Sequence, residues 1–154
     1  VFSTLHTNDA PITITRLQNM GTPDYLISAA CQLVVAQRLA RKNCKECKVP
    51  DDDVNPKVLQ DLGFSPELAS RAKAYKGKGC EKCSNTGYKG RQGIYEILVV
   101  SKPLKEAILR QATTPELREI AIKEGFQMMQ DMGRRLIASG DLNFREYERV
   151  LSSE

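Results

Sequence analysis

Apolar residues recur every three or four positions through much of the chain, and this spacing is typical of helices with one buried face. Proline and glycine mark where these stretches begin and end. The pattern predicts helices at about Pro11–Met20, Pro23–Val35, Pro56–Leu62, Pro66–Ala74, Lys102–Arg110, Pro115–Glu124, Met128–Ser139 and Phe144–Ser152.

Four of these helices are predicted to begin at a polar residue followed by proline, which favours an N-cap and the first helical position. The predicted N-caps are Thr22, Asn55, Ser65 and Thr114. Asn143 and Glu146 have the spacing of a capping box. Gly21, Gly63, Gly125 and Gly140 stand where helices are expected to stop.

Strands are predicted at three places. Ile94–Val100 is rich in β-branched residues, Ala36–Asn43 leads into a cysteine pair, and residues 1–5 read as the end of a strand that enters a polar turn at residues 3–9. Residues 77–93 are rich in glycine and are expected to form turns. The chain begins without methionine, within this expected strand, so we expect it to be a segment of a longer protein.

Four cysteines form two short pairs, Cys44 with Cys47 and Cys80 with Cys83, separated by residues 48–79. Two Cys-x-x-Cys loops supply the four thiolates that Zn²⁺ prefers, and thiolate selects Zn²⁺ over Mg²⁺ or Ca²⁺. Two disulfides are the alternative, but nothing in these residues resembles a signal peptide. We therefore expect one zinc site, and we expect Cys31, within an apolar run, to lie in the core.

At 154 residues and 41% hydrophobic residues, the chain is long enough for one domain or two small ones with a buried core. It has no tryptophan, which argues against a stacking platform for single-stranded nucleic acid. Its apolar stretches are far shorter than the ~20 residues that span a bilayer. We expect a soluble cytoplasmic protein with no transmembrane segment.

The net charge of +4 is concentrated around the cysteines, since residues 38–91 carry 13 Lys or Arg against seven Asp or Glu. Such a basic zinc module could bind nucleic acid, anionic lipid or an acidic protein. The alternative is a solvated surface that compensates the formal charge of a four-thiolate zinc centre. The absence of a long basic run favours this second interpretation.

His6 is the only histidine, and it lies among hydroxyl, amide and carboxylate groups at residues 3–9. Such a cluster can hold water or a phosphate oxygen, although a single histidine in a polar turn is more often merely exposed.

Three segments resemble the secretion ATPases that drive type II secretion and type IV pilus assembly. They are residues 3–10 (STLHTNDA), residues 36–39 (AQRL) followed by the two cysteine pairs, and residues 90–96 (GRQGIYE). The first resembles that family's His box, and the cysteine pairs resemble the metal-binding insertion of its assembly-type members. The resemblance covers nearly the whole chain.

This resemblance implies an α/β fold that ends a RecA-like P-loop ATPase core, followed by a zinc-binding insertion and a mainly helical C-terminal part. The implied segments are residues 1–43, 44–90 and 91–154. It also implies a cytoplasmic homo-hexamer, peripheral at the inner membrane, that binds ATP and Mg²⁺ and acts on an inner-membrane platform protein. Whether the parent builds a pilus or serves type II secretion stays open.

Several residue roles follow from the resemblance. His6 is expected near the ATP γ-phosphate as the catalytic residue, with Thr4, Thr7 and Asn8 shaping its loop. Arg38 either contacts a neighbouring motif or subunit or is an ordinary surface arginine. Arg91 and Glu96 are expected to join the zinc module to the core through a salt bridge or backbone contacts.

The chain lacks the G-x-x-x-x-G-K-[ST] phosphate loop and an acidic Walker B segment. We therefore expect these parts to precede Val1 and the chain alone to be inactive. Two alternatives remain. Residues 79–91 also resemble one zinc repeat of the Hsp40 chaperones, although that family has four in succession. A basic zinc module could instead bind nucleic acid or an acidic partner, whereas the ATPase interpretation predicts no nucleic-acid binding.

Overall fold

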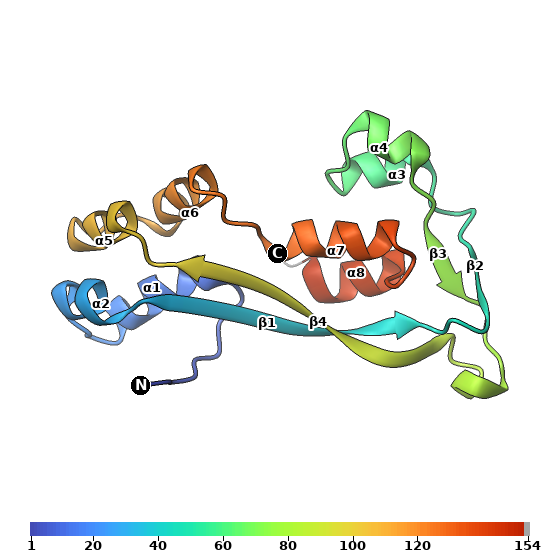
Figure 1. Ribbon diagram of the computed structural model, residues 1–154, viewed down its shortest axis with the longest axis horizontal. Coiled ribbons are helices and arrows are strands. Elements are labelled where there is room, and N and C mark those ends of the chain that lie inside the picture. Colours follow the sequence, from blue (N-terminus) through green and yellow to red (C-terminus); the bar gives the residue numbers. More distant parts are fainter. Residues whose placement is uncertain (153–154) are drawn as a thin grey trace. The chain divides into compact units, whose positions relative to one another are not determined.

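The computed structural model describes residues 1–152 (Figure 1). Contacts divide the chain into two compact units. Unit 1 comprises Val1–Gln37 and Tyr95–Met128, and unit 2 comprises Arg38–Ile94 and the described part of Met129–Glu154. Each unit combines segments that are distant in sequence. The division into segments 1–43, 44–90 and 91–154 follows chain order and stays a prediction, and residues 153–154 lie outside the described residues.

Two long strands, β1 (Leu33–Asn43) and β4 (Tyr88–Val99), pair with each other. Their arrows run in opposite directions in Figure 1. Side chains alternate between faces along β1, so that Val34 and Ala36 are buried while Leu33 and Val35 are exposed. Our expectation that a helix continues to Val35 is wrong, because the β-branched residues Val34 and Val35 favour a strand.

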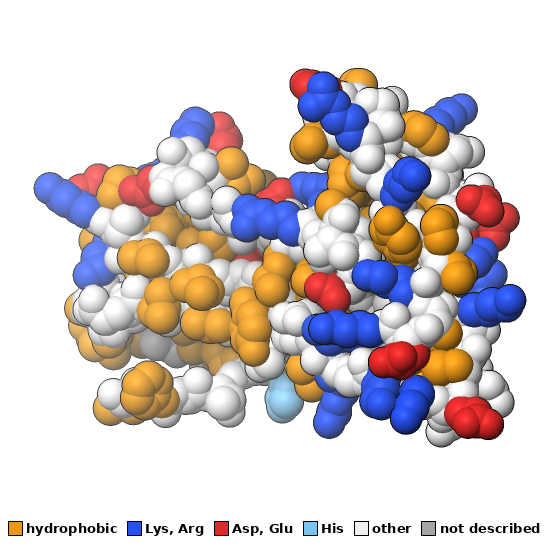
Figure 2. Space-filling model, turned by 45° about the vertical axis from the view of Figure 1, so that its right-hand side comes forward, with side chains coloured by type: hydrophobic (Ala, Val, Ile, Leu, Met, Phe, Trp, Pro, Cys, Tyr) orange, Lys and Arg blue, Asp and Glu red, His pale blue; other side chains and the backbone are white. Residues whose placement is uncertain are grey.

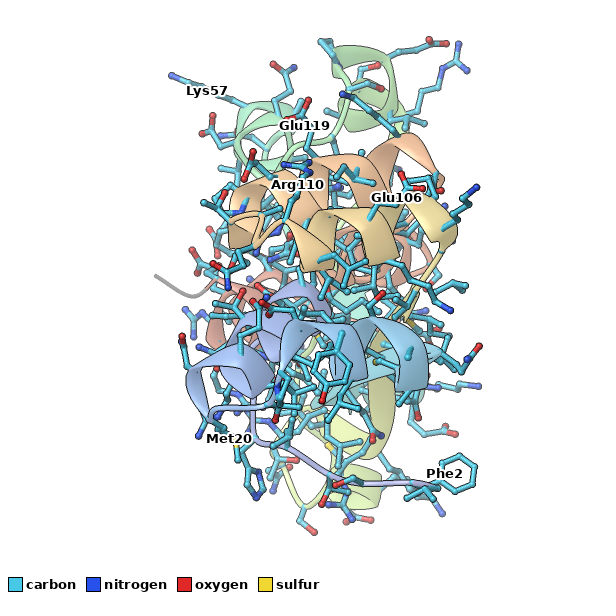
Figure 3. All side chains as sticks on the ribbon, turned by 90° about the vertical axis from the view of Figure 1, so that its left-hand side faces the viewer. Phe2, Met20, Lys57, Glu106, Arg110 and Glu119 are labelled. Carbon is cyan, nitrogen blue, oxygen red and sulfur yellow. The ribbon has the colours of Figure 1, made fainter. Side chains whose placement is uncertain are left out.

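Unit 1 contains four short helices: α1 (Ala10–Asn19), α2 (Asp24–Ala30), α5 (Lys102–Leu109) and α6 (Thr114–Lys123). Helix α2 packs against α5, and α1 packs against α6. In Figure 3 the pair α5 and α6 forms one layer and α1 and α2 form another, while Glu106, Arg110 and Glu119 are exposed on the first pair. The buried side chains between them include Ile14, Ile27, Leu104, Ile108 and Leu117.

Residues 1–7 have no regular secondary structure, and most of their side chains are exposed. The strand expected at residues 1–5 is therefore not formed. Its apolar content is only Val1, Phe2 and Leu5, and among the described residues no partner strand lies beside it.

Unit 2 is built around a second small sheet. Strand β2 (Lys48–Pro50) pairs antiparallel with β3 (Tyr75–Gly77), with Lys48 opposite Gly77. Two short helices, α3 (Pro56–Asp61) and α4 (Pro66–Arg71), connect these strands, and a 3-10 turn, η1 (Glu81–Cys83), precedes β4. Helices α7 (Met129–Ala138) and α8 (Phe144–Leu151) pack against each other.

Most helix ends follow the chemistry of their capping residues. Asn55 and Ser65 accept hydrogen bonds from the backbone N–H groups of Val58 and Leu68, as predicted. Two caps are shifted by one residue: Thr113 rather than Thr114 caps α6, and Pro23 rather than Thr22 precedes α2. Thr113 is preferred because Glu116 completes a capping box with it.

The four glycines predicted to end helices all have positive φ: Gly21, Gly63, Gly125 and Gly140. The fold class is α/β in the sense of mixed helices and small sheets. Within residues 1–152, every helix is too short or too polar to cross a membrane.

Helix α8 is held to β1 by a buried carboxylate, Glu146, which is only 1% exposed. Its oxygens accept hydrogen bonds from the backbone N–H of Arg41 at 2.8 Å and from the guanidinium groups of Arg41 and Arg149. Asn143 caps the helix through the N–H of Glu146, as predicted, but the Glu146 side chain turns to the arginines instead of completing a capping box. Burial alone would raise the pKa of Glu146, yet Arg149 and Arg41 lower it to about 2.

The pKa of Glu146 predicts how the free energy of unfolding changes with pH. Because the folded-state pKa lies near 2 and the usual value is 4.5, this carboxylate stabilises the fold above about pH 4.5 and loses the effect as pH falls toward 2. The difference in free energy of unfolding between the wild type and Glu146→Gln should shrink by about 3 kcal/mol over that range. Urea unfolding at several pH values measures it.

The matched control is Glu148→Gln, which changes an exposed glutamate of the same helix. Because this side chain is exposed, the variant shows how much of any pH dependence comes merely from removing a carboxylate from α8. A Glu146→Gln difference that stayed constant with pH would contradict the role given to the arginines.

Candidate metal centre and histidine loop

The four paired cysteines converge on one point. Their sulfur atoms all lie within 4.8 Å of one another. Cys44 Sγ lies 3.8 Å from Cys80 Sγ, and Cys47 Sγ lies 3.9 Å from Cys83 Sγ. All four are free cysteines, so the disulfide alternative is wrong for this structure. The distances match the ~3.8 Å expected between sulfurs around one tetrahedral ion with bonds of ~2.3 Å.

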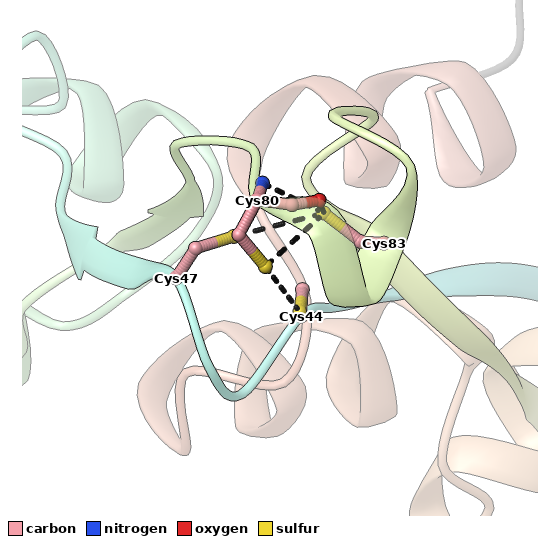
Figure 4. A group of neighbouring side chains, drawn as sticks. All are labelled: Cys44, Cys47, Cys80 and Cys83. Carbon is pink, nitrogen blue, oxygen red and sulfur yellow. Dashed lines mark hydrogen bonds between the residues drawn. The ribbon is translucent and has the colours of Figure 1, made fainter.

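Each cysteine pair sits where a regular element ends, as Figure 4 shows. Cys44 follows β1 directly and Cys47 directly precedes β2. Cys80 precedes η1 and Cys83 ends it, so the tight 3-10 turn aims both sulfurs to the same side. Cys44 and Cys83 are buried, and Cys47 and Cys80 are partly exposed.

Backbone N–H groups point at two of the sulfurs. Gly79 donates to Cys47 Sγ at 3.2 Å, and Cys80 and Gly87 both donate to Cys83 Sγ at 3.2 Å. Burial raises the pKa of the Cys47 thiol to about 11, and its three thiol neighbours add to this effect. Burial opposes ionisation of Cys83 as well, but the two N–H donors lower the pKa of its thiol to about 6. Cys83 is thus prepared to be a thiolate, the form that binds metal.

Gly77 and Gly87 let the strand before the second pair pass close to the segment after it. A Cβ atom on Gly87, which has a φ of +77°, would lie 2.5 Å from the carbonyl oxygen of Gly77. Gly87 N–H also donates to Cys83, and its carbonyl oxygen accepts from Cys44 N–H at 2.9 Å. The spacing Cys-x-x-Cys-x-x-x-Gly in the sequence is the signal for this contact.

Asn43 links the metal centre to the helical part of unit 2. Its side-chain amide donates to the carbonyl oxygens of Tyr75 at 3.0 Å and Gly140 at 3.1 Å, and its backbone N–H donates to Asp141. Asn43 precedes Cys44, so the first cysteine is fixed against both β3 and the turn between α7 and α8. We did not predict this role of Asn43 from the sequence.

The surface of unit 2 is rich in basic side chains, many of them visible in Figure 2. Lys45 and Lys82 lie between the cysteines of their pairs and are exposed. Glu46 and Glu81 are exposed in the same two loops, so the charges of each loop cancel and the excess of basic residues lies outside the loops.

In unit 1, His6 is exposed and belongs to the loop before α1. It lines a hollow of about 240 Å³ together with Thr7, Asn8, Arg16 and other residues of α1. The hollow therefore combines an imidazole, a guanidinium and hydroxyl and amide groups, a set that can bind anionic oxygen atoms. Arg16 was missed from the sequence, although it is the only basic residue among the first 37 apart from His6.

The remaining predicted site residues fall in different places. Thr4 is exposed near the chain start, and Thr7 shares a hydrogen bond with Thr13 at 2.8 Å. Arg38 belongs to unit 2, where its guanidinium donates to the carbonyl oxygen of Val150. Glu96 accepts a hydrogen bond from the backbone N–H of Ala10, so its contact is with the start of α1.

Removal of the metal should unfold the cysteine-bearing part of unit 2. Its sheet strands have only three residues each, and metal binding supplies about 10 kcal/mol or more of folding free energy in small domains. We expect one ion per chain by elemental analysis and a large fall in melting temperature with a chelator.

Replacing any one of Cys44, Cys47, Cys80 and Cys83 by serine should have the same effect. The control is Cys31→Ser, which leaves all four sulfurs in place. A melting curve that a chelator left unchanged would contradict a structural metal.

Gly87→Ala should lower metal affinity by tenfold or more, because the added methyl group collides with the backbone at Gly77. Gly90→Ala is the matched control: Gly90 also has a positive φ, of +82°, but a Cβ there meets nothing within 4 Å. Competition with a chromophoric chelator measures both. If both variants bound the metal more weakly, and to the same extent, the positive φ of the glycine and not its close contact with Gly77 would be the cause.

Comparison with known proteins identifies the family that the chain resembles. Residues 1–149 match the family described as "Type II/IV secretion system protein". The type IV pilus assembly ATPase PilB of Myxococcus xanthus is 40% identical over 146 residues, covering 95% of this chain and 26% of the relative. PilB of Thermus thermophilus is 44% identical over 133 residues, covering 86% of this chain and 15% of the relative.

The type II secretion system ATPase E of Vibrio cholerae is 36% identical over 149 residues, covering 87% of this chain and 29% of the relative. The chain thus spans between 15 and 29% of the length of these three relatives. The resemblance found from the His6 segment, the cysteine pairs and residues 90–96 is confirmed: the chain belongs to the type II/IV secretion system protein family.

Proposed function

We propose that the chain is the C-terminal part of a motor ATPase that couples ATP hydrolysis to type IV pilus assembly or type II protein secretion. The observation that carries this proposal is the match to the family over residues 1–149. Relatives of both kinds are similar over most of the chain, so the two export processes remain joint candidates. The parent is proposed to be a homo-hexamer with a RecA-like P-loop core.

We propose that the metal is Zn²⁺ and that its role is structural. Four thiolates around one ion are typical of closed zinc sites, in which no coordination position is left for a substrate. Cys44, Cys47, Cys80 and Cys83 would hold it. The hydrogen bond from Asn43 to Gly140 would then hold the turn between α7 and α8 in place when the metal is bound.

In the proposed enzyme, His6 faces the γ-phosphate of ATP bound with Mg²⁺. The exposed imidazole could sense the γ-phosphate or orient the attacking water, with Thr4, Thr7 and Asn8 shaping the loop. Its position in the same hollow as Arg16 supports contact with a negatively charged group.

The phosphate loop and the Walker B segment are absent from residues 1–154, so other parts of the parent are proposed to hold the phosphates and Mg²⁺. The chain alone should then be inactive. The proposed location is the cytoplasmic face of the inner membrane, where the motor would act on a platform protein. No nucleic acid is part of this proposal.

The test is ATP turnover by the longer parent chain under conditions that allow oligomer formation. We expect the wild type to hydrolyse ATP and His6→Ala to lower kcat by at least tenfold, because the γ-phosphate or the water loses its partner. Normal turnover by His6→Ala would remove its catalytic role.

Cys44→Ser in the same assay tests whether the zinc centre matters to chemistry or only to coupling. Absence of turnover in the wild type would overturn the ATPase proposal. Binding to nucleic acid whose logarithm falls linearly with the logarithm of salt concentration would then favour the basic zinc module as a binding element.

A further inference from the structure

Glu96 is a carboxylate buried within unit 1, where it is only 3% exposed. It lies in β4, and its Oε1 atom accepts a hydrogen bond from the backbone N–H of Ala10. Ala10 is the first residue of α1 and is itself fully buried. A charged side chain is rarely buried to this degree unless its partners need it there.

The hydrogen bond from Ala10 gives the last unpaired N–H group at the start of α1 an acceptor. Asp9 caps the helix by accepting from Ile12 N–H at 2.8 Å, and Pro11 has no N–H to donate. Ala10 N–H is thus the remaining donor among the first three helical positions, and Glu96 satisfies it.

The loop that carries His6 is anchored at the same place by other bonds. Thr7 shares a hydrogen bond with Thr13 at 2.8 Å, and Thr13 Oγ1 donates to the carbonyl oxygen of Asp9 at 3.2 Å. The carboxylate of Asp9 pairs with Arg118 of α6 at 2.7 Å. These bonds and the one from Ala10 all hold the chain within four residues after His6, between Thr7 and Ala10.

We propose that Glu96 is a positioning residue for His6 in ATP hydrolysis: by holding Ala10 N–H, it fixes the point where the histidine loop enters α1. This inference rests on the proposed function. Only three residues lie between His6 and Ala10, so a shift of Ala10 is expected to move the loop that carries the imidazole. A misplacement of about 1 Å at a reacting group can cost about 100-fold in rate.

The proposal predicts a particular kinetic pattern. Loss of the anchor misplaces His6 but leaves the phosphate-binding loop elsewhere in the parent intact, so kcat should fall while KM for ATP changes little. A purely structural Glu96 would instead leave kcat per folded enzyme unchanged.

The experiment uses the full-length parent with three substitutions of Glu96. Glu96→Ala removes the acceptor, Glu96→Asp keeps the charge but shortens the reach by one methylene group, and Glu96→Gln keeps an acceptor oxygen at the original reach. Glu106→Ala, which changes an exposed glutamate of α5, is the matched control. The readouts are kcat, KM, metal content, melting temperature and hydrogen exchange of the Ala10 amide.

We expect Glu96→Ala and Glu96→Asp to lower kcat at least tenfold, with KM within threefold of the wild type and faster exchange at Ala10. Glu96→Gln should recover most of the rate and the protection of Ala10, and Glu106→Ala should match the wild type. If Glu96→Ala fails to fold, the pair Glu96→Asp and Glu96→Gln still separates reach from charge.

Fast exchange at Ala10 together with a normal kcat in Glu96→Asp would overturn the proposal, because the anchor would then be structural only. A kcat that fell as much in Glu96→Gln as in Glu96→Asp, with Ala10 still protected, would also overturn it. These outcomes differ from failure of the proposed function, in which the wild-type parent itself shows no ATP turnover.

Discussion

In unit 2 the four cysteine sulfur atoms must lie close together, although residues 48–79 separate the two pairs in sequence. The rest of this unit depends on that constraint. The sheet that brings them together is small, since β2 and β3 have three residues each. Lys78 N–H donates to the carbonyl oxygen of Cys47 at 3.0 Å, which places the second cysteine pair directly beyond the end of this sheet. The pairing of β2 with β3 and the convergence of the sulfurs therefore support each other.

The segment that bears the first cysteine pair is also bonded to parts of unit 2 that contain no cysteine of the cluster. Asn43 hydrogen-bonds both to Tyr75 in β3 and to Gly140 between α7 and α8. Two residues before Asn43, Arg41 pairs with the buried Glu146 of α8 and lies over the ring of Tyr88 in β4, 4.1 Å from its centroid. The end of β1 is thus bonded to β3, to α8 and to the turn between α7 and α8, and it lies against the ring of Tyr88 in β4. If the cysteines hold a metal ion, these bonds connect its site to α8.

Local signals were sufficient for much of this fold. The helix ends at Asn55, Ser65 and Gly140 and the grouping of the four cysteines follow from residues adjacent in sequence, because capping and Cys-x-x-Cys geometry are local. The helix predicted to reach Val35 and the strand predicted at residues 1–5 failed because a strand depends on a partner that local pattern does not reveal.

The same limit explains which site residues were missed. Glu146 was predicted only as part of a capping box, although its main partners are Arg41, 105 residues away, and Arg149. Glu96 was expected to join two parts of the chain, but its contact with Ala10, 86 residues away, could not be read from a single sequence. Arg16, by contrast, could have been chosen as a candidate site residue, because it is the only Lys or Arg among residues 1–37.

A histidine that acts on a bound phosphate needs two properties that oppose each other. Its ring must be open to the ligand, and its backbone must be fixed, because an exposed loop gains entropy by moving. In this chain the two demands of the role proposed for His6 are met by different residues. His6 is exposed, whereas Thr7, Asp9 and Ala10 are bonded to Thr13, Arg118 and Glu96. Two of these three partners belong to the segment Tyr95–Met128, so the later part of unit 1 holds the loop in place while α1 supplies the rest of its hollow.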